Sequence, residues 1–248
     1  MELRFGIEQW SAWAPGLTDQ TSWRAWLDQP VPLLETTVPP LLDMPAMMRR
    51  RVERLGRMAL QAAYTCLGDA PVDAVVFASR YGDCARSVDL LSSLAQGEPL
   101  SPTSFSLSVH NAIAALFSIA RADRSAYSAI AAGDETIEAA VIEALGQLAD
   151  GKTRVLLVYF DEPLPAIHHG FQDCVEIPRG WALRLVRADA AGWTLQPALC
   201  ADAEPVLNPH QPDARLSPDL AVLKFLLSKN DRLVCQRGER RWCWRYHA

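Results

Sequence analysis

The sequence predicts an α/β protein, in which helices cover a mainly parallel sheet and β-hairpins form the C-terminal part. The first observation is an alternation of strand-length apolar runs and amphipathic helices between residues 46 and 160, the pattern of a layered parallel sheet. The second is a change after residue 162, where strand-like runs follow one another across short turns. The third is size, since 248 residues, half of them hydrophobic, can bury a large core. We expect an N-terminal domain, 1–162, and an extension, 163–248, packed on it as one compact unit.

The N-terminal third contains a short helix and a long one. Residues 1–40 are rich in tryptophan and proline, which predicts strand and extended connections around a short helix at 23–27 that Pro30 ends. Residues 46–67 predict a long helix, because apolar side chains recur at helical spacing and arginines fill the other face. Gly68 follows the last apolar position, as glycine commonly does after a helix.

Strands and helices then alternate along the chain. Short apolar runs predict buried strands at 73–79, 125–132 and 155–160. Helical patterns occupy 87–96, 109–121 and 135–149. Asp134 stands just before the last of these helices, where a carboxylate can accept hydrogen bonds from free backbone N–H groups.

The C-terminal extension predicts two hairpins and one helix. The strand-like runs are 181–188 with 193–199, and 232–236 with 240–247. A Pro-rich connection at 201–217 leads to a helix at 218–228. Ser217 is a candidate N-cap for this helix, and Pro218 suits its first turn.

Composition excludes several classes of function. The net charge is −5 with a pI near 5.6, and no basic face for nucleic acid is evident. No apolar run approaches the ~18 residues that cross a bilayer, and the start lacks the pattern of a signal peptide. We expect a cytoplasmic protein without direct membrane insertion. Six widely spaced cysteines and the adjacent His168 and His169 predict no disulfide framework, metal site or cofactor.

Residues 101–148 resemble the β-ketoacyl synthases of the thiolase fold. The run NAIAALFSI, residues 111–119, is similar to the family motif Asn-Ala-x-Ala-Gly-x-x-Ser-Ile, with Ala115 in place of glycine. The arginine-rich helix at 45–63 resembles the helix that the family carries upstream, and the likeness covers residues 45–162. The short, N-terminal-domain-only homologues of aryl polyene pigment clusters have the pattern SxxSVHNAxAG…AxAAGExS. This pattern resembles the present chain more than any full-length synthase does. That resemblance implies a chain-length-factor-like subunit.

The same resemblance implies that catalysis is lost. Ketosynthases use a cysteine thiolate at a strand-to-helix turn, and two histidines from their C-terminal half. Aligned without a gap, the nucleophile position falls on Asp134; a second register places Ile130 there. Neither residue is cysteine, and the two histidine-bearing loops have no counterpart in the 248 residues. We expect no turnover by the chain alone, and Asp134 is expected to cap its helix.

The resemblance also implies an interface with an active ketosynthase, as a heterodimer or higher assembly. In the thiolase fold, the strand before the nucleophile pairs across the dimer axis; here it is 125–132. An uncovered apolar strand edge is an aggregation hazard, so a partner is expected to cover it. The residues that the resemblance assigns to this interface and to the acyl tunnel are Ser104, Phe105, His110, Asn111, Ser125, Tyr127 and Ser128. An acyl carrier protein would join through the complex, during elongation of a polyene or fatty acyl chain.

Two other functions stay open at this point. The first is a free-standing acyltransferase or thioesterase that uses Asp134, Cys84 or His110. The second is a structural homodimer that binds acyl chains or carrier protein. The Trp- and Arg-rich run 240–246 is either a docking element or an edge hairpin that covers core.

Overall fold

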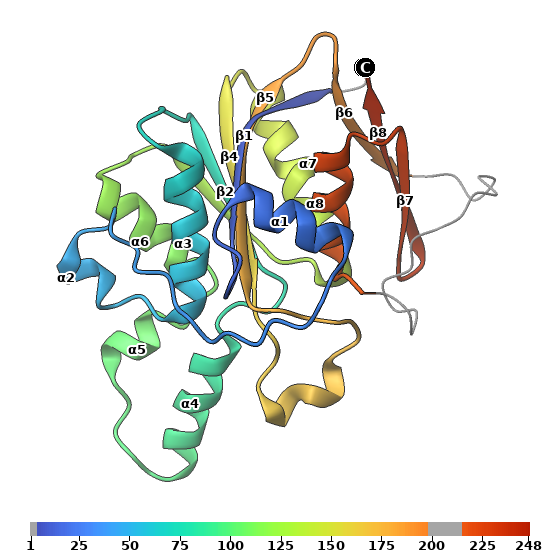
Figure 1. Cartoon of the computed structure of the whole chain (residues 1–248). Helices are drawn as coiled ribbons and strands as arrows, with labels where there is room; N and C mark the ends of the chain where they lie inside the picture. Colours follow the sequence, from blue (N-terminus) through green and yellow to red (C-terminus); the bar gives the residue numbers. More distant parts are fainter. Residues whose placement is uncertain (1–3, 198–214) are drawn as a thin grey trace.

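The computed structural model describes residues 4–197 and 215–248 and shows one twisted sheet with helices on both faces (Figure 1). Residues 201–214 of the predicted connection 201–217 lie outside the described part of the chain. In the described part, the sheet has the strand order β3-β2-β4-β5-β1-β6-β8-β7. The strands are β1 Phe5–Trp13, β2 Ala74–Ala78, β3 Ala126–Ile130, β4 Arg154–Asp161, β5 Arg179–Arg187, β6 Gly192–Pro197, β7 Arg232–Arg237 and β8 Arg240–His247.

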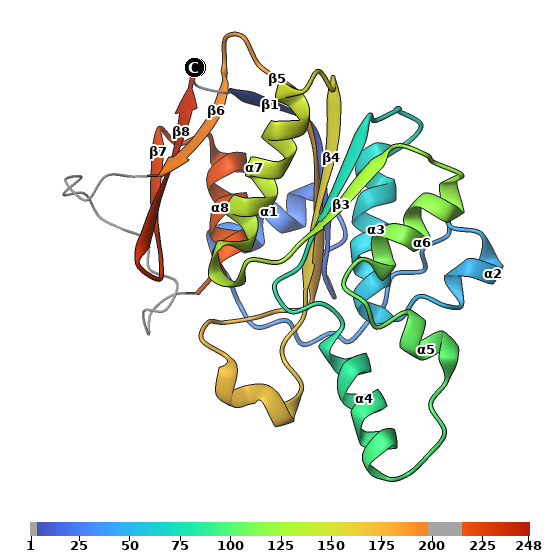
Figure 2. The same cartoon turned by 180° about the vertical axis from the view of Figure 1, so that it is seen from behind.

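Helices cover both faces of the sheet, as the two opposite views show (Figures 1 and 2). One face packs against α3 and α6, and the other against α7, α8 and α1. Successive residues of β4 point to opposite layers: Leu157 joins the core on the α7 side, whereas Leu156 and Val158 join the core on the α3 side. The helices are α1 Gln20–Asp28, α2 Ala46–Arg49, α3 Arg54–Leu67, α4 Cys84–Ala95, α5 Pro102–Ser106, α6 Ala112–Arg121, α7 Thr136–Ala149 and α8 Pro218–Ser228, with short 3₁₀ helices η1 Gly133–Glu135 and η2 Ala166–Phe171.

The predicted α/β class is confirmed, and the sheet is mixed. Parallel pairing occurs where strands and helices alternate, between β2 and its neighbours β3 and β4. The pairs β4–β5, β5–β1, β1–β6, β6–β8 and β8–β7 are antiparallel. Apart from β4, these strands lie outside the alternating region that supports the parallel prediction.

One of the two predicted hairpins is wrong. The runs 181–188 and 193–199 form β5 and β6, but these strands do not pair with each other, because β1 lies between them. Trp10 of β1 pairs with Leu183, and Phe5 pairs with both Arg187 and Trp193. Two strand-like runs that are adjacent in the sequence form a hairpin only if no strand from elsewhere in the chain inserts between them. The second hairpin, β7–β8, is confirmed.

The long helix predicted at 46–67 is broken into α2 and α3. The Arg57 guanidinium donates to the carbonyl oxygens of Arg49 at 3.1 Å and Val52 at 3.0 Å. These bonds satisfy carbonyl groups that a continuous helix would have paired with backbone N–H groups. Helical spacing alone could not reveal this break, since Val52 is buried on the same face as the residues of α3.

The sheet continues across the boundary predicted at 162/163. Residues of β5 are hydrogen-bonded to β4 on one side and to β1 on the other. Two fully buried arginines join further elements: Arg179 of β5 pairs with Asp219 of α8, and Arg237 of β7 pairs with Glu138 of α7. None of the described helices is long and apolar enough to cross a membrane.

Candidate functional site

The carboxyl ends of the three parallel strands lie side by side, at the edge where open α/β sheets usually bind ligands. Ser79 and Arg80 directly follow β2, and Asp161 is the last residue of β4. Asp134 lies four residues after the end of β3, in η1. The strands therefore bring together side chains that are far apart in the sequence.

Asp161 organises the turn that follows β2. Its carboxylate accepts hydrogen bonds from the Ser79 hydroxyl at 2.7 Å and from the backbone N–H groups of Arg80 at 2.9 Å and Tyr81 at 3.2 Å. The Ser79 hydroxyl in turn accepts the Gly82 N–H at 2.8 Å. Burial raises the pKa of Asp161, because the charged form loses water. The network fixes the backbone from which Arg80 projects.

Arg80 is the centre of an ionic cluster over this edge. Its guanidinium donates to Asp134 at 2.5 Å and to both oxygens of Asp173, at 2.7 and 2.6 Å. It also lies over the Tyr81 ring, 4.9 Å from the centroid. Asp173 belongs to the loop between η2 and β5, so Arg80 ties that loop to the end of the sheet. We call Arg80, Asp134 and Asp173 the Arg80 cluster.

The expectation that Asp134 caps the following helix is wrong. Asp134 lies inside η1, and its carboxylate is bound to Arg80. Thr136 satisfies this turn instead: its hydroxyl accepts the Ala132 N–H at 3.0 Å and donates to the Gly133 carbonyl at 2.6 Å. The sequence does not show that Arg80, at the end of β2, binds the Asp134 carboxylate and so takes it away from the N-terminus of the helix. Ile130, the alternative for the nucleophile position, ends β3 and packs against the core.

His110 joins the same edge, while Ser104, Phe105 and Asn111 lie further out. His110 Nε2 is 2.9 Å from the Ser79 carbonyl oxygen. The Ser104 hydroxyl is 3.5 Å from the Arg86 guanidinium, and Phe105 of α5 is 63% exposed. Asn111 is at the N-cap position of α6 and is exposed, with no side-chain cap bond.

Strand β3 forms one edge of the whole sheet (Figure 2). Tyr127, its second residue, is 39% exposed. Ser125 bonds to Asp123 at 2.6 Å, and Ser128 donates to Glu143 of α7 at 2.8 Å. The carbonyl and N–H groups of this edge pair with no other strand in the described part of the chain. Nearby, Ile119 of α6 is 66% exposed.

The remaining candidate nucleophile is not activated. Cys84 begins α4, but burial raises the pKa of its thiol, and the Asp161 and Asp83 charges raise it further. His168 and His169 lie in η2. Across residues 4–197 and 215–248, no group of three or more His, Cys, Asp or Glu side chains is placed to hold a metal ion.

The sequence analysis missed Arg80, Asp161 and Asp173. A usable signal existed for the first two, because each stands at the end of a predicted buried strand, and parallel strands end at a common edge. Asp173 lies in an irregular loop, where no local pattern predicts its position. Only the folded chain shows that it reaches Arg80.

Layered helices on this sheet, with a strand-to-helix turn at the common edge, define a ketosynthase-like protein of the thiolase fold. The family described as "Beta-ketoacyl synthase, N-terminal domain" matches residues 23–245, and the chain belongs to it. No curated protein sequence matches the chain.

Solved structures extend this result. The chain is similar to a chain of "Ketosynthase (ApeO) in Complex with its Chain Length Factor (ApeC) from Xenorhabdus doucetiae", with 28% identity and a TM-score of 0.80 over 98% of this chain and 100% of that chain. "The ishigamide ketosynthase/chain length factor" matches at 14% identity and a TM-score of 0.66, over 99% and 100% of the two chains. A type II polyketide synthase complex of ketosynthase and acyl carrier protein, AntDE:AntF, matches at 12% identity and a TM-score of 0.64, over 100% of both chains. The two last matches show the shared fold.

Proposed function

We propose that this chain is a non-catalytic, chain-length-factor-like subunit that binds an active β-ketoacyl-acyl-carrier-protein synthase and helps to shape its acyl tunnel. The partner supplies the cysteine and histidines, and an acyl carrier protein delivers the growing chain to the complex. The product is a polyene of the aryl polyene type or a related fatty acyl chain. The complex acts in the cytoplasm, and residues 1–162 and 163–248 enter it as one folded unit.

The observation that carries the proposal is the exposed β3 edge. Its backbone groups are available for pairing with a strand of another subunit, and Tyr127 projects from it half-exposed. Native proteins rarely leave such an edge open. The likeness to a chain of the ApeO–ApeC complex supports a ketosynthase as the protein that covers it.

The chemistry at the strand ends supports a non-catalytic role. A carboxylate cannot form the thioester that the synthase reaction requires, and that of Asp134 is engaged by Arg80. The Cys84 thiol has a raised pKa, which keeps it protonated and poorly nucleophilic near neutral pH. His110 Nε2 is 2.9 Å from a backbone carbonyl, so neither residue is placed as an activated nucleophile.

The exposed Phe105 of α5 supports a role in the tunnel. We assign Ser104 and Phe105 to the tunnel wall, and His110, Asn111, Ser125, Tyr127 and Ser128 to the interface or its surroundings. The Phe105 side chain is 63% exposed, so a bulky apolar ring is available to a partner. A ring in that position would limit how far an acyl chain can grow.

Co-expression with the neighbouring full-length ketosynthase tests the proposal, with a tag on one partner and native mass spectrometry of the purified material. A one-to-one or higher mixed complex is expected. A homodimer with no ketosynthase bound would contradict the proposal and favour the structural homodimer.

A matched pair of variants locates the interface. Tyr127→Arg places a charge on the β3 edge and is expected to reduce recovery of the complex at least tenfold, since charged groups at an interface core are costly to desolvate. Leu34→Arg makes the same kind of change at an exposed leucine outside β3, and is expected to leave recovery unchanged. Equal recovery with both variants would count against an interface at β3.

A further inference from the structure

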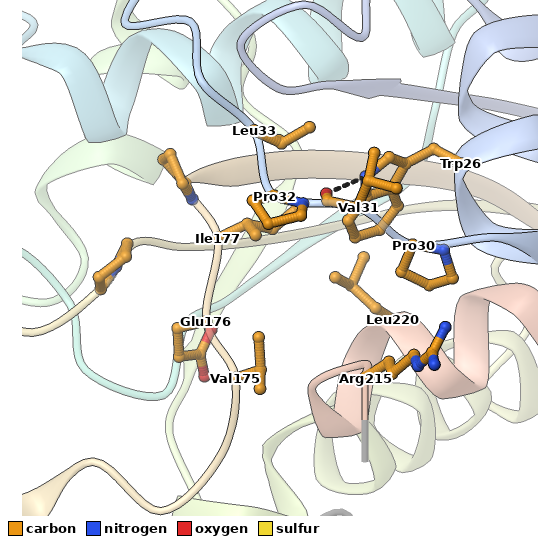
Figure 3. A pocket seen from close by; sticks show the side chains of 12 residues that line it. Trp26, Pro30, Val31, Pro32, Leu33, Val175, Glu176, Ile177, Arg215 and Leu220 are labelled. Atoms are coloured by element: carbon orange, nitrogen blue, oxygen red, sulfur yellow. Dashed lines mark hydrogen bonds between the residues drawn. The ribbon is translucent and has the colours of Figure 1, made fainter. Parts of the chain in front are cut away.

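A cavity of about 890 Å³ opens on the α1 and α8 side of the sheet (Figure 3). Ligand sites in proteins commonly have volumes of about 300–1,000 Å³, so this cavity is large enough for a small molecule. None of its lining residues belongs to the Arg80 cluster or to β3. Its wall is formed by Trp26, residues 30–33, Pro163, residues 175–178, Arg215 and Leu220.

The wall is apolar and stiff. Proline occurs in both extended segments that face each other, at positions 30 and 32 and again at 178, which fixes part of the backbone on each side. Val31, Leu33 and Ile177 line the space between them (Figure 3). A cavity of this composition favours a ligand that brings apolar surface.

The polar side chains of the inner wall, those of Trp26 and Glu176, are engaged within the protein. The Trp26 indole N–H donates to the Val31 carbonyl oxygen at 2.8 Å. The Glu176 carboxylate accepts the Arg179 guanidinium at 2.5 Å and the Cys174 thiol at 3.3 Å, and its side chain is only 1% exposed. Donors and acceptors of a ligand would therefore find no free partner on these two side chains, at a cost in free energy. A hydrocarbon chain brings none.

Arg215, three residues before α8, gives the cavity a cationic side. It is exposed, and its guanidinium lies across the cavity from Glu176 (Figure 3). Arginine binds carboxylates through a planar pair of N–H donors. The ligand that matches both parts of the wall therefore has an apolar body and an anionic end.

We propose that this cavity binds an aliphatic carboxylate, with its alkyl chain between residues 30–33 and 175–178 and its carboxylate at Arg215. The inference goes beyond the proposed function and does not depend on it, because the cavity lies apart from the β3 edge.

Calorimetric titration of the full chain with decanoate and dodecanoate tests whether the cavity binds the alkyl chain of the ligand. Each additional buried methylene is expected to tighten binding roughly fourfold. Val31→Glu adds a charge to the wall and is expected to weaken dodecanoate binding by at least tenfold. The matched control is Leu34→Glu in the same segment, which is 91% exposed and outside the wall. Val31 is itself 59% exposed, so the glutamate can be accommodated without unfolding.

A second comparison tests the anionic end. Arg215→Ala is expected to weaken dodecanoate binding about tenfold and to leave the affinity for methyl dodecanoate unchanged. Circular dichroism confirms that each variant is folded. Absence of dodecanoate binding, or equal weakening by Val31→Glu and Leu34→Glu, would overturn the proposal and favour a polypeptide in the cavity. Equal binding of the acid and its methyl ester would overturn the assignment of the carboxylate to Arg215.

Discussion

Replacing Arg237 by methionine tests how the C-terminal hairpin is joined to the rest of the fold. Arg237 is the last residue of β7, and its Nε and Nη2 atoms each lie 3.1 Å from Glu138 Oε1 in α7. Both side chains are fully buried. Methionine has similar bulk and no charge, so the change removes the cation and leaves the Glu138 carboxylate buried without its partner.

The expected loss of stability follows from this burial. Removing one partner of a buried ion pair costs about 3–5 kcal/mol, because the other charge stays uncompensated. Arg237 is the main stabilising partner of the Glu138 carboxylate, and the second Glu138 oxygen accepts no hydrogen bond from the described residues. Domains of this kind have unfolding free energies of about 5–15 kcal/mol. We therefore expect a folded but strongly weakened protein at neutral pH.

The loss also depends on pH, with a defined sign. Burial already raises the pKa of Glu138 above its value in the unfolded chain, and Arg237 opposes that shift. Without the arginine, the pKa rises further. A group with a raised folded-state pKa favours folding when protonated, so the variant recovers stability as the pH falls and loses it as the pH rises through that pKa.

Urea unfolding followed by tryptophan fluorescence measures both effects, because Trp244 is buried beside this pair. The double variant Glu138→Leu/Arg237→Met is the control: replacing both charges by apolar groups is expected to restore most of the loss. The reasoning is refuted if Arg237→Met costs less than about 1 kcal/mol, far below the usual range for buried pairs. It is also refuted if the loss is the same in acid and at neutral pH.

Four further predictions concern the site and the proposed complex. Phe105→Ala lengthens the product of the reconstituted complex, as measured by mass spectrometry, whereas Phe171→Ala, which removes another exposed ring, on η2, leaves product length unchanged. Asp134→Asn lowers the chain's unfolding free energy by about 1–3 kcal/mol, the value of a hydrogen bond to a charged group, and leaves turnover per complex unchanged. Iodoacetamide labels Cys84 slowly near neutral pH and faster as pH rises, because burial raises its thiol pKa. Burial raises the pKa of Glu176 to about 7, from an ordinary value of 4.5, so wild-type stability in urea declines as the pH rises from about 4.5 to about 7, and this decline is smaller in Glu176→Gln.

Local patterns predicted most individual elements, because each rests on spacing within a short window. The apolar runs at β2, β3 and β4 and the helical face of α7 were identified within a few residues of their observed ends. The pairing of strands was harder to predict. Strand β1 separates β5 from β6, and nothing in the sequences of β5 and β6 indicates that a distant strand inserts between them. The same limit applied to Asp134, whose carboxylate binds an arginine 54 residues away rather than its own helix.

The site was predictable in part, from the resemblance to β-ketoacyl synthases and from the rule that parallel strands end at a common edge of the sheet. The motif at 111–119 led to Asp134 as the residue at the nucleophile position, and the structure places that residue at the common edge of the parallel strands. The sequence did not reveal the Arg80 cluster, because its third member, Asp173, lies in an irregular loop. Roles in an interface or tunnel depend on a second chain, so they remain predictions for the complex.

The central place of β1 has a consequence for how the chain is made. Residues 5–13 leave the ribosome well before both neighbours of this strand, β5 and β6, which are synthesised about 170–190 residues later. At about 5–20 residues per second, that delay is roughly 10–40 s. During this time Trp10 and Trp13 belong to a strand without hydrogen-bonding partners, and the middle of the sheet cannot close. Nascent chains therefore need shielding of this strand, by a chaperone or by a partner already folded nearby, until β5 and β6 have been synthesised.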